Sequence, residues 1–415
     1  MSNKEKKIVP ELRFSEFKDE WKPTTIEKNC NLKGRIGFRG YTKSDLVAKG
    51  EGALVLGGKH IQNQKLDLSD PTYLNWEKYY ESPEIMVEVG HIIFSQRGSL
   101  GDCALIDEEI GKATINPSMV LLKDITCNEK FLYYILIGKY IQREVERIST
   151  NTAVPMLSQK QIKEFPFFKP SPKEQQKIAN CLSSLDEVIT AETKKLDLLQ
   201  EHKKGLLQQL FPQVGDVLSG VEVRKQPKYR FPDFENDGDW KETTLKDICD
   251  ITNGKSNAQD HIENGEYPLF DRSEVIKASD KFLFDCEAVI LPGEGMRFIP
   301  KYYSGKFDLH QRAYALKDFN CNGKYVYYYM LANSNLLASK AVQSTVLSLR
   351  LPILQKFPII IPIGDKGKLE QQKIANCLSS VDELIEAQTQ KIEDLHEHKK
   401  GLLQQLFPNI NDVVV

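Results

Sequence analysis

Apolar residues recur at intervals of four and three in two separate stretches of this chain, 174–212 and 370–408. Such spacing, sustained over more than four heptads, predicts a long helix that buries a narrow seam against a partner. In the first stretch the seam positions are Leu185, Ile189, Glu192, Leu196, Leu199, Lys203 and Leu206. In the second stretch they are Ile385, Gln388, Ile392, Leu395, Lys399, Leu402 and Leu406.

The two stretches are copies of each other, because 30 of their 39 aligned positions are identical. Ser171, Pro172 and Glu174 form a helix-start signal before the first copy, and Pro212 and Pro408 close the two copies. Each copy is therefore predicted to be one helix, roughly 58 Å long at ~1.5 Å per residue. A repeat of this size predicts a chain built from two related units.

Polar residues within the seam indicate how the two copies pair. A parallel pair would set Lys203 against Lys399, two like charges in a half-buried seam. An antiparallel pair whose facing residue numbers sum to 591 sets Glu192 against Lys399 and Gln388 against Lys203. The short linker, 213–228, also favours the antiparallel arrangement. We predict an antiparallel two-helix coiled coil in this register; the alternative is that each amphipathic helix lies on a globular core.

The segments that precede the two helices are distantly alike and predict two mixed domains. Short strands are expected at 53–56, 92–94, 288–291 and 357–361, and helices at 129–147 and 324–339. The predicted fold class is α+β: two mixed α/β domains with many short strands, separated by the antiparallel coiled coil in a pseudo-two-fold arrangement. The predicted boundaries are 1–170 for the first domain, 171–212 for the first helix, 213–228 for the linker, 229–366 for the second domain, 367–408 for the second helix and 409–415 for a tail.

Composition and charge narrow the class of protein. With 40% apolar and 27% charged residues, the chain has the make-up of a globular protein, and no run approaches the ~18–20 apolar residues of a membrane span. The eight cysteines include no CxxC pair, so reduced thiols and a cytoplasmic location are expected. A net charge of −2 lacks the basic excess of a protein that binds nucleic acid unaided. Binding to DNA would therefore need local basic patches or a partner that supplies charge.

If the chain binds DNA, the candidates for contact are the loops that are basic, polar and rich in glycine. Arginine reads guanine and asparagine or glutamine reads adenine in the major groove, and the other reading of each residue is a solvated loop or a structural ion pair. In the first domain the candidates are Lys33, Arg35, Arg39, Tyr41, Lys43, Lys59, His60, Gln96, Arg97 and Asn151. In the second they are Lys255, Ser256, Asn257, Gln259, Arg272, Arg297, His310, Gln311, Arg312, Ser344 and Arg350.

Catalytic motifs are not expected in this chain. Asp239-Trp240-Lys241 after Pro232-Asp233 resembles a nuclease metal site, but the spacing is short, and Trp240 is expected to anchor the first strand of its domain. The sequence has no GxxxxGK[ST] for a nucleotide, no HExxH for zinc, and no FxGxG with [ND]PP[FY] for adenine methylation. We predict neither catalytic residues nor metal ligands.

The chain resembles the specificity subunit of a type I restriction-modification system. The resemblance covers nearly the whole chain. It rests on EQQKIANCLSSLDEVI, repeated as EQQKIANCLSSVDELI, on HKKGLLQQLFP, present twice, and on RFxxF followed by tryptophan at the start of each domain. It implies two target recognition domains that each read one half of a bipartite double-stranded DNA site. It also implies that the repeated helices hold the domains apart and dock two modification (methyltransferase) subunits, with restriction (motor-nuclease) subunits completing the enzyme.

The resemblance further implies a non-catalytic subunit with no cofactor of its own. S-adenosylmethionine, ATP and magnesium are then expected on the partner subunits, and no membrane is involved. Two alternatives stay open: a standalone or orphan double-headed DNA-binding protein, and a coiled-coil scaffold whose domains bind protein.

Overall fold

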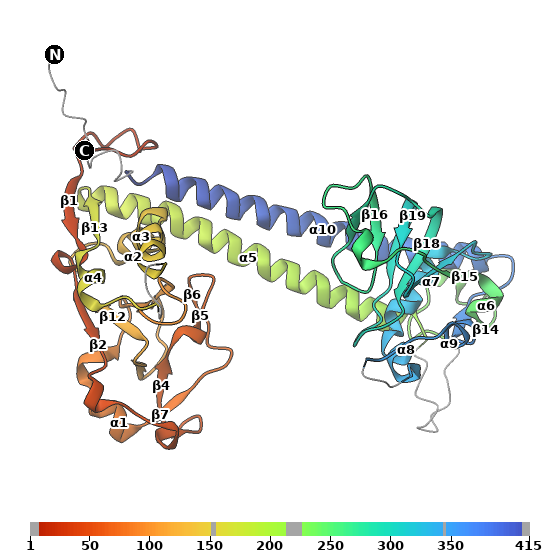
Figure 1. The fold of residues 1–415 in the computed structure, drawn as a ribbon, viewed down its shortest axis with the longest axis horizontal. Helices are drawn as coiled ribbons and strands as arrows, with labels where there is room; N and C mark the ends of the chain where they lie inside the picture. Colours follow the sequence, from red (N-terminus) through yellow and green to blue (C-terminus); the bar gives the residue numbers. More distant parts are fainter. Residues whose placement is uncertain (1–7, 151–154, 213–225, 343–345, 409–415) are drawn as a thin grey trace, which may run out of the picture. The chain divides into compact units, whose positions relative to one another are not determined.

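The computed structural model describes residues 8–150, 155–212, 226–342 and 346–408, and the chain divides into two compact units. Unit 1 comprises Met1–Glu192 and Lys391–Val415, and unit 2 comprises Thr193–Gln390. Within them we call residues 8–171 head 1 and residues 226–366 head 2. Two long helices, α5 (Pro172–Leu210) and α10 (Gly367–Gln405), contain 39 residues each (Figure 1). The first part of α5 belongs to unit 1 and its remainder to unit 2, and α10 is divided in the opposite order.

Within each unit the two helices run antiparallel, as the sequence predicts. In unit 1, Glu192 pairs with Lys391 at 2.6 Å and Asp186 pairs with Lys399 at 2.6 Å, so the numbers rise on one helix as they fall on the other. The predicted register is wrong, because Lys399 pairs with Asp186 rather than with Glu192. The residue numbers of the Asp186–Lys399 pair sum to 585 instead of the predicted 591, so the two helices are displaced by about six residues from the predicted register.

An aspartate and a tyrosine set this register, and both units use the same pair. In unit 1 the Tyr134 hydroxyl donates to Asp186 at 2.8 Å, and Lys399 lies over the Tyr134 ring. In unit 2, Lys203 pairs with Asp382 at 2.5 Å, Tyr328 donates to Asp382 at 2.7 Å, and Lys203 lies over the Tyr328 ring. All the predicted seam positions are buried or half-buried. Tyrosines from the heads therefore help to hold the seam lysines in place.

Head 1 is built from short strands in four small sheets. The larger two have the orders β10-β9-β12-β2 and β3-β7-β4-β11-β8, and the smaller two pair β1 with β13 and β5 with β6. The strands are β1 (Lys22–Thr25), β2 (Asn31–Gly34), β3 (Leu46–Val47), β4 (Gly52–Leu56), β5 (Ile61–Gln62), β6 (Lys65–Leu66), β7 (Tyr73–Asn75), β8 (Met86–Val87), β9 (Ile92–Ser95), β10 (Cys103–Leu105), β11 (Ala113–Ile115), β12 (Met119–Lys123) and β13 (Pro166–Lys169). The helices are α1 (Trp76–Tyr80), α2 (Glu129–Ile137), α3 (Lys139–Ser149) and α4 (Gln159–Glu164). The helix predicted over 129–147 is broken at Gly138, where the backbone turns extended.

Head 2 has one large sheet with the order β15-β20-β18-β19-β16-β17 and a small one that pairs β14 with β21. The strands are β14 (Lys241–Thr244), β15 (Asp250–Asn253), β16 (Tyr267–Phe270), β17 (Lys277–Ser279), β18 (Phe284–Pro292), β19 (Lys301–Leu309), β20 (Ala313–Lys317) and β21 (Pro358–Ile361). The helices are α6 (Leu245–Ile248), α7 (Gly323–Ala332), α8 (Ser334–Lys340) and α9 (Leu351–Gln355). The sheet curls, since Ser256, just beyond β15, forms a bridge with His310 at the end of β19. The predicted α+β class is confirmed.

The end of each long helix completes the core of a head. In unit 1, Phe407 packs on Phe131 and Trp21, with ring centroids 5.6 and 6.3 Å apart. In unit 2, Phe211 packs on Tyr325 at 5.2 Å, and Trp240 lies on the same ring. The backbone repeats the arrangement, because Leu12 donates to the Gln405 carbonyl at 2.9 Å and Tyr229 donates to the Gln209 carbonyl at 3.0 Å. The repeated QQLFP ending thus closes an equivalent aromatic core in both units.

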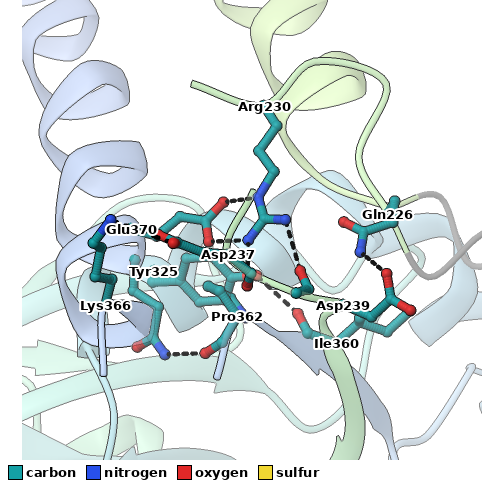
Figure 2. A network of polar contacts seen from close by, with 11 residues as sticks. Gln226, Arg230, Asp237, Asp239, Tyr325, Ile360, Pro362, Lys366 and Glu370 are labelled. Carbon is teal, nitrogen blue, oxygen red and sulfur yellow. Dashed lines mark hydrogen bonds and ion pairs between the residues drawn. The ribbon is translucent and has the colours of Figure 1, made fainter. Parts of the chain in front are cut away.

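The repeated EQQ at the start of each helix ties that helix to its head. Arg230 at the start of head 2 binds Glu370 through two hydrogen bonds of 2.7 and 2.8 Å (Figure 2). Arg13 binds Glu174 in the same way at 2.7 and 2.8 Å, and Trp21 donates a further bond to Glu174. Both glutamates are about 1% exposed. A buried carboxylate held by a bidentate arginine is costly to disrupt, because removal of one partner leaves the other charge unpaired.

The two glutamines that follow each glutamate hold the helix that carries the head's aromatic residues. Gln371 accepts from the Asn322 backbone at 2.9 Å, and Gln372 accepts from the Asn322 side chain at 2.8 Å. Gln175 and Gln176 make the same contacts with Asn128, the residue that caps α2. Every residue of EQQ therefore has a structural role in both units.

We expect Glu370→Ala to destabilise unit 2 by roughly 3–5 kcal/mol, because Arg230 would be left without its carboxylate. Glu174→Ala should cost about 1–2 kcal/mol more in unit 1, since Trp21 loses its acceptor as well. The Trp240 indole N–H has no partner among the described residues, so unit 2 lacks that term. Hydrogen exchange in α2 and α7 reports the two units separately, and Glu383→Ala, exposed on α10, is the matched control. Equal effects of Glu370→Ala and Glu383→Ala would contradict this assignment.

Candidate nucleic-acid interface

In head 2 the predicted contact loops meet at one edge of the large sheet. Gln311 donates to the Ser256 carbonyl at 2.9 Å, Gly293 donates to the Arg312 carbonyl at 2.8 Å, and Leu349 donates to the Gly293 carbonyl at 2.8 Å. Gly254 permits the closest approach, since an added Cβ would lie 1.9 Å from the Leu309 carbonyl oxygen. Loops that are far apart in the sequence are thus joined by backbone hydrogen bonds.

Two arginines at this edge share one carboxylate. Glu294 binds Arg272 at 2.8 Å and Arg312 at 3.0 Å. The hydrogen bond from Arg312 is the main reason that the pKa of the Glu294 carboxyl lies below its usual value. The arginine side chains are 47% and 55% exposed, so both guanidinium groups reach solvent. The three residues form a preorganised group with a net charge of +1.

A cleft of about 650 Å³ adjoins the group. Arg272, Arg297 and Lys301 contribute positive charge to its lining, and Ile290, Pro292 and Ile299 contribute apolar surface. Asp271 and Glu274 also line the cleft and contribute negative charge. Met296, also in the lining, is 79% exposed, an unusual state for a methionine side chain. Apolar side chains beside arginines are a combination used against DNA bases and thymine methyl groups.

The other head 2 candidates divide into exposed and buried side chains. Lys255, Asn257, Gln259, Arg297, Gln311 and Arg350 are exposed, and Gln311 donates to the Asn257 side chain at 2.8 Å. Ser256 is 2% exposed and donates to Asp308 at 2.7 Å, whereas His310 is 5% exposed. The last two residues hold the loops in position and do not present their side chains to solvent.

Head 1 also brings its candidate loops together. Asn116 donates to the Leu56 carbonyl at 2.8 Å, the Gln96 side chain donates to the Pro117 carbonyl at 3.0 Å, and Leu157 donates to the Gln96 carbonyl at 3.0 Å. Lys59 is exposed and pairs with Asp70 at 2.6 Å. Arg97 is exposed and lies 3.1 Å from the Met156 sulfur. The loops after β4, β9 and β11 therefore form one surface.

The segment 33–43 is more structural than its composition indicates. Arg35 is half-buried and donates to the Ile115 carbonyl at 3.2 Å and the Thr114 hydroxyl at 3.0 Å, and it lies over the half-buried Tyr41 ring. Burial lowers the pKa of the Arg35 guanidinium. Arg39 pairs with Glu84 at 3.2 Å. Only Lys33 and Lys43, among the candidates of this segment, are exposed side chains.

Two candidates, Asn151 and Ser344, lie outside the described residues. Composition does not select Glu294 and Met296 as contact residues, because neither belongs to a basic, polar loop. The glycines of Pro292-Gly293-Glu294-Gly295, directly after an apolar strand, do indicate a turn of the kind that lets the backbone approach a ligand closely.

The described residues contain no group of three or more His, Cys, Asp or Glu that could hold a metal ion. Trp240 of the sequence Asp239-Trp240-Lys241 is buried in the head 2 core, and Asp239 accepts a bond from Gln226 at 2.6 Å. Among the described helices, none has the length and apolarity needed to cross a membrane.

The family profile described as the type I restriction modification DNA specificity domain matches this chain twice, over residues 42–201 and 237–397. These matches cover more than half of the chain, so the protein belongs to the family of type I restriction-modification specificity subunits. Specificity subunits are non-catalytic, and catalysis resides on partner subunits. The predicted resemblance is therefore confirmed.

Individual relatives are distant. The EcoDI specificity subunit of Escherichia coli is 26% identical over 144 residues, which are 35% of this chain and 32% of that protein. The chain thus spans about a third of the length of the EcoDI subunit. The MjaVIII specificity subunit of Methanocaldococcus jannaschii is 23% identical over 327 residues, 71% of this chain and 74% of that protein.

Two solved structures share the fold. The specificity subunit of M. genitalium superposes with a TM-score of 0.61 at 18% identity, over 97% of this chain and all of that chain. A second structure, described as the basis of complex assembly and conformational transition of the type I restriction-modification system, gives 0.55 at 14% identity over 94% and 98%. Both likenesses concern the fold of the chain.

Three buried histidines predict that the stability of the heads depends on pH. His60, His91 and His310 each accept a backbone N–H at Nδ1, from Gly57, Glu88 and Arg312 at 3.0–3.1 Å. Burial is the main cause that lowers the pKa of each imidazole. Since the folded pKa lies below the unfolded value of about 6.5, the unfolded chain binds more protons as the pH falls. The contribution of the neutral imidazoles to stability is complete above pH ~6.5 and is lost as the pH falls below that value.

We expect the free energy of unfolding of both heads to fall between pH 7.5 and 5.5, a window above the titration of carboxylates. Replacement of His60 by Gln should reduce this slope in head 1, with a loss at pH 7.5 on the order of 1 kcal/mol, the net value of one buried hydrogen bond. His202→Gln, exposed on α5, is the control and should change neither quantity. A His60→Gln protein with the wild-type slope would rule out this explanation.

Proposed function

We propose that this chain is the DNA-reading subunit of a type I restriction-modification enzyme and binds a bipartite double-stranded target, one half with each head. The observation that carries the proposal is duplication: each head presents converging polar and basic loops, while the arginine–glutamate pair, the two glutamine contacts and the aromatic closure that attach it to α5 and α10 are repeated in both units. A constant attachment with different loops supports two readers with different sequence preferences. The two continuous helices act as the spacer between the half-sites.

The low net charge of the chain supports DNA binding that is shared with partner subunits. At a net charge of −2, the subunit alone neutralises few phosphates, and affinity for DNA depends steeply on that number. Exposed cations gather locally at the loop edges, for example Lys255, Arg297 and Arg350. The subunit therefore supplies sequence discrimination, and its partners supply most of the nonspecific affinity.

The surface of the long helices supports the docking of two copies of one partner. Core packing explains identity at buried positions only, yet many identical positions of the two copies are exposed. In unit 1 they include Glu187, Glu397, His398 and Lys400. In unit 2 the equivalents are Glu383, Glu201, His202 and Lys204. We assign this repeated surface to two modification subunits, with restriction subunits joining that complex.

The chemistry is placed on those partners. S-adenosylmethionine would bind the modification subunits, and ATP and magnesium would bind the restriction subunits. This chain would contribute the choice of the adenine to be methylated, through the position in which it holds the DNA.

Co-expression with the type I modification subunit of the same host tests the proposal. The pair should copurify with two modification subunits per chain, and single-molecule sequencing should find methylated adenines in one bipartite motif that is absent without this chain. Glu397→Lys should reduce the complex to one modification subunit by native mass spectrometry, and the double variant with Glu201→Lys should remove both. Glu393→Lys, exposed on α10 at a position that is not repeated, is the control.

Three other outcomes decide between this function and its alternatives. A motif-specific DNA complex that forms without any modification subunit would favour a standalone DNA-binding protein. Copurification with other proteins and no methylation would favour a scaffold. An unchanged complex in the double variant would reject the assigned docking surface.

A further inference from the structure

The turn after β9 and the turn after β18 occupy the same place in the two heads. Arg97 forms an isolated antiparallel bridge with Met156, and Glu294 forms one with Ser348. In each case the residue before the bridge, Gln96 or Gly293, accepts a hydrogen bond from a leucine N–H at 3.0 or 2.8 Å. Glycines with positive φ, 81° at Gly98 and 148° at Gly295, follow both turns. Arg97 and Glu294 are therefore equivalent positions of the two heads.

The equivalent backbone positions carry opposite charges. In head 1 the Arg97 side chain is exposed beside Met156. In head 2, Glu294 holds two guanidinium groups, through one Nη1 nitrogen of Arg272 and one of Arg312. The Nε and Nη2 donors of both arginines have no hydrogen-bond partner among the described residues. Each head thus presents free guanidinium donors at this turn, one directly and the other through a carboxylate.

A carboxylate close to DNA would be repelled by the phosphates unless neighbouring cations outweighed its negative charge. Here its charge is outweighed by two arginines, and its oxygens hold one Nη1 nitrogen of each arginine. A guanidinium tethered at one nitrogen has fewer positions to lose, and so loses less entropy, when its other donors bind two acceptors of a base. Guanine offers such a pair in the major groove, O6 and N7, and arginine is its commonest partner.

We propose that this turn determines sequence preference in both heads: Glu294 positions Arg272 and Arg312 to read guanine in the half-site of head 2, and Arg97 reads guanine directly in that of head 1. The proposal rests on the proposed function and deepens it. Glu294 is a positioning residue, because the two arginines make the contacts with the bases.

Single-molecule sequencing of methylated adenines in cells that express each variant with the modification subunit tests the proposal. Arg312→Lys keeps the charge but loses the fork, and should lower the discrimination at a guanine of one half-site roughly tenfold or more. Glu294→Gln should relax the same half-site, while the affinity for unrelated DNA stays equal or rises because a negative charge is lost. Arg97→Lys should relax the other half-site only.

Two controls keep the outcomes apart. Lys241→Ala removes an exposed cation of head 2 on β14 and should leave the motif unchanged. Hydrogen exchange of α7 should match the wild type in every head 2 variant, so that a changed motif reflects reading and not unfolding. If the wild-type complex methylates no motif, the proposed function fails. If it does, and Arg312→Lys and Glu294→Gln retain the wild-type motif, or Arg97→Lys and Arg312→Lys change the same half-site, only the present inference is overturned.

Discussion

The aromatic contact between each head and the end of a long helix is the constraint on which the rest of this structure depends. Phe407 closes the core of head 1 against Trp21 and Phe131, and Phe211 closes that of head 2 against Tyr325. These helix ends belong to helices that begin in the other unit. Burial of such rings contributes several kcal/mol, so separating the C-terminal end of either long helix from the head that it contacts is costly. Two heads of different sequence are therefore attached to the long helices by the same kind of contact.

This constraint explains the distribution of identity between the copies. The EQQ start and the GLLQQLFP end are the same twice because they fit equivalent sites, from the Arg–Glu pair to the backbone bond of Gln209 or Gln405. The differing positions fall between 185 and 200 in the first copy, away from both the EQQ start and the GLLQQLFP end. The candidate contact loops of each head do not take part in these attachment contacts, so their sequences can differ between the heads. A change from Arg97 to Glu294 at one equivalent position alters what is presented without altering the attachment.

The sequence predicted the helices, their direction and the α+β heads, because heptad spacing and proline boundaries are local signals. It did not predict the register, since Asp186 and Asp382 are held by Tyr134 and Tyr328, which come from the heads and not from the seam. The candidate loops were found by composition, but burial was not visible in it: Arg35, His60, Ser256 and His310 hold loops in place. The pairing of Glu294 with Arg272 and Arg312 could not be predicted from the sequence, because the three residues lie on different loops that only the fold brings together.

We propose that two equivalent attachment sites carry two heads that recognise DNA independently of each other. The most direct measurement is the methylated motif produced by a chain in which head 2 is replaced by a second copy of head 1, with both long helices retained. Since Leu12 and Tyr229 make the same bond to their helix ends, the second copy should seat normally. We expect a bipartite motif with the head 1 half-site on both sides, as an inverted repeat. An assembled complex that still methylates the original asymmetric motif would contradict it.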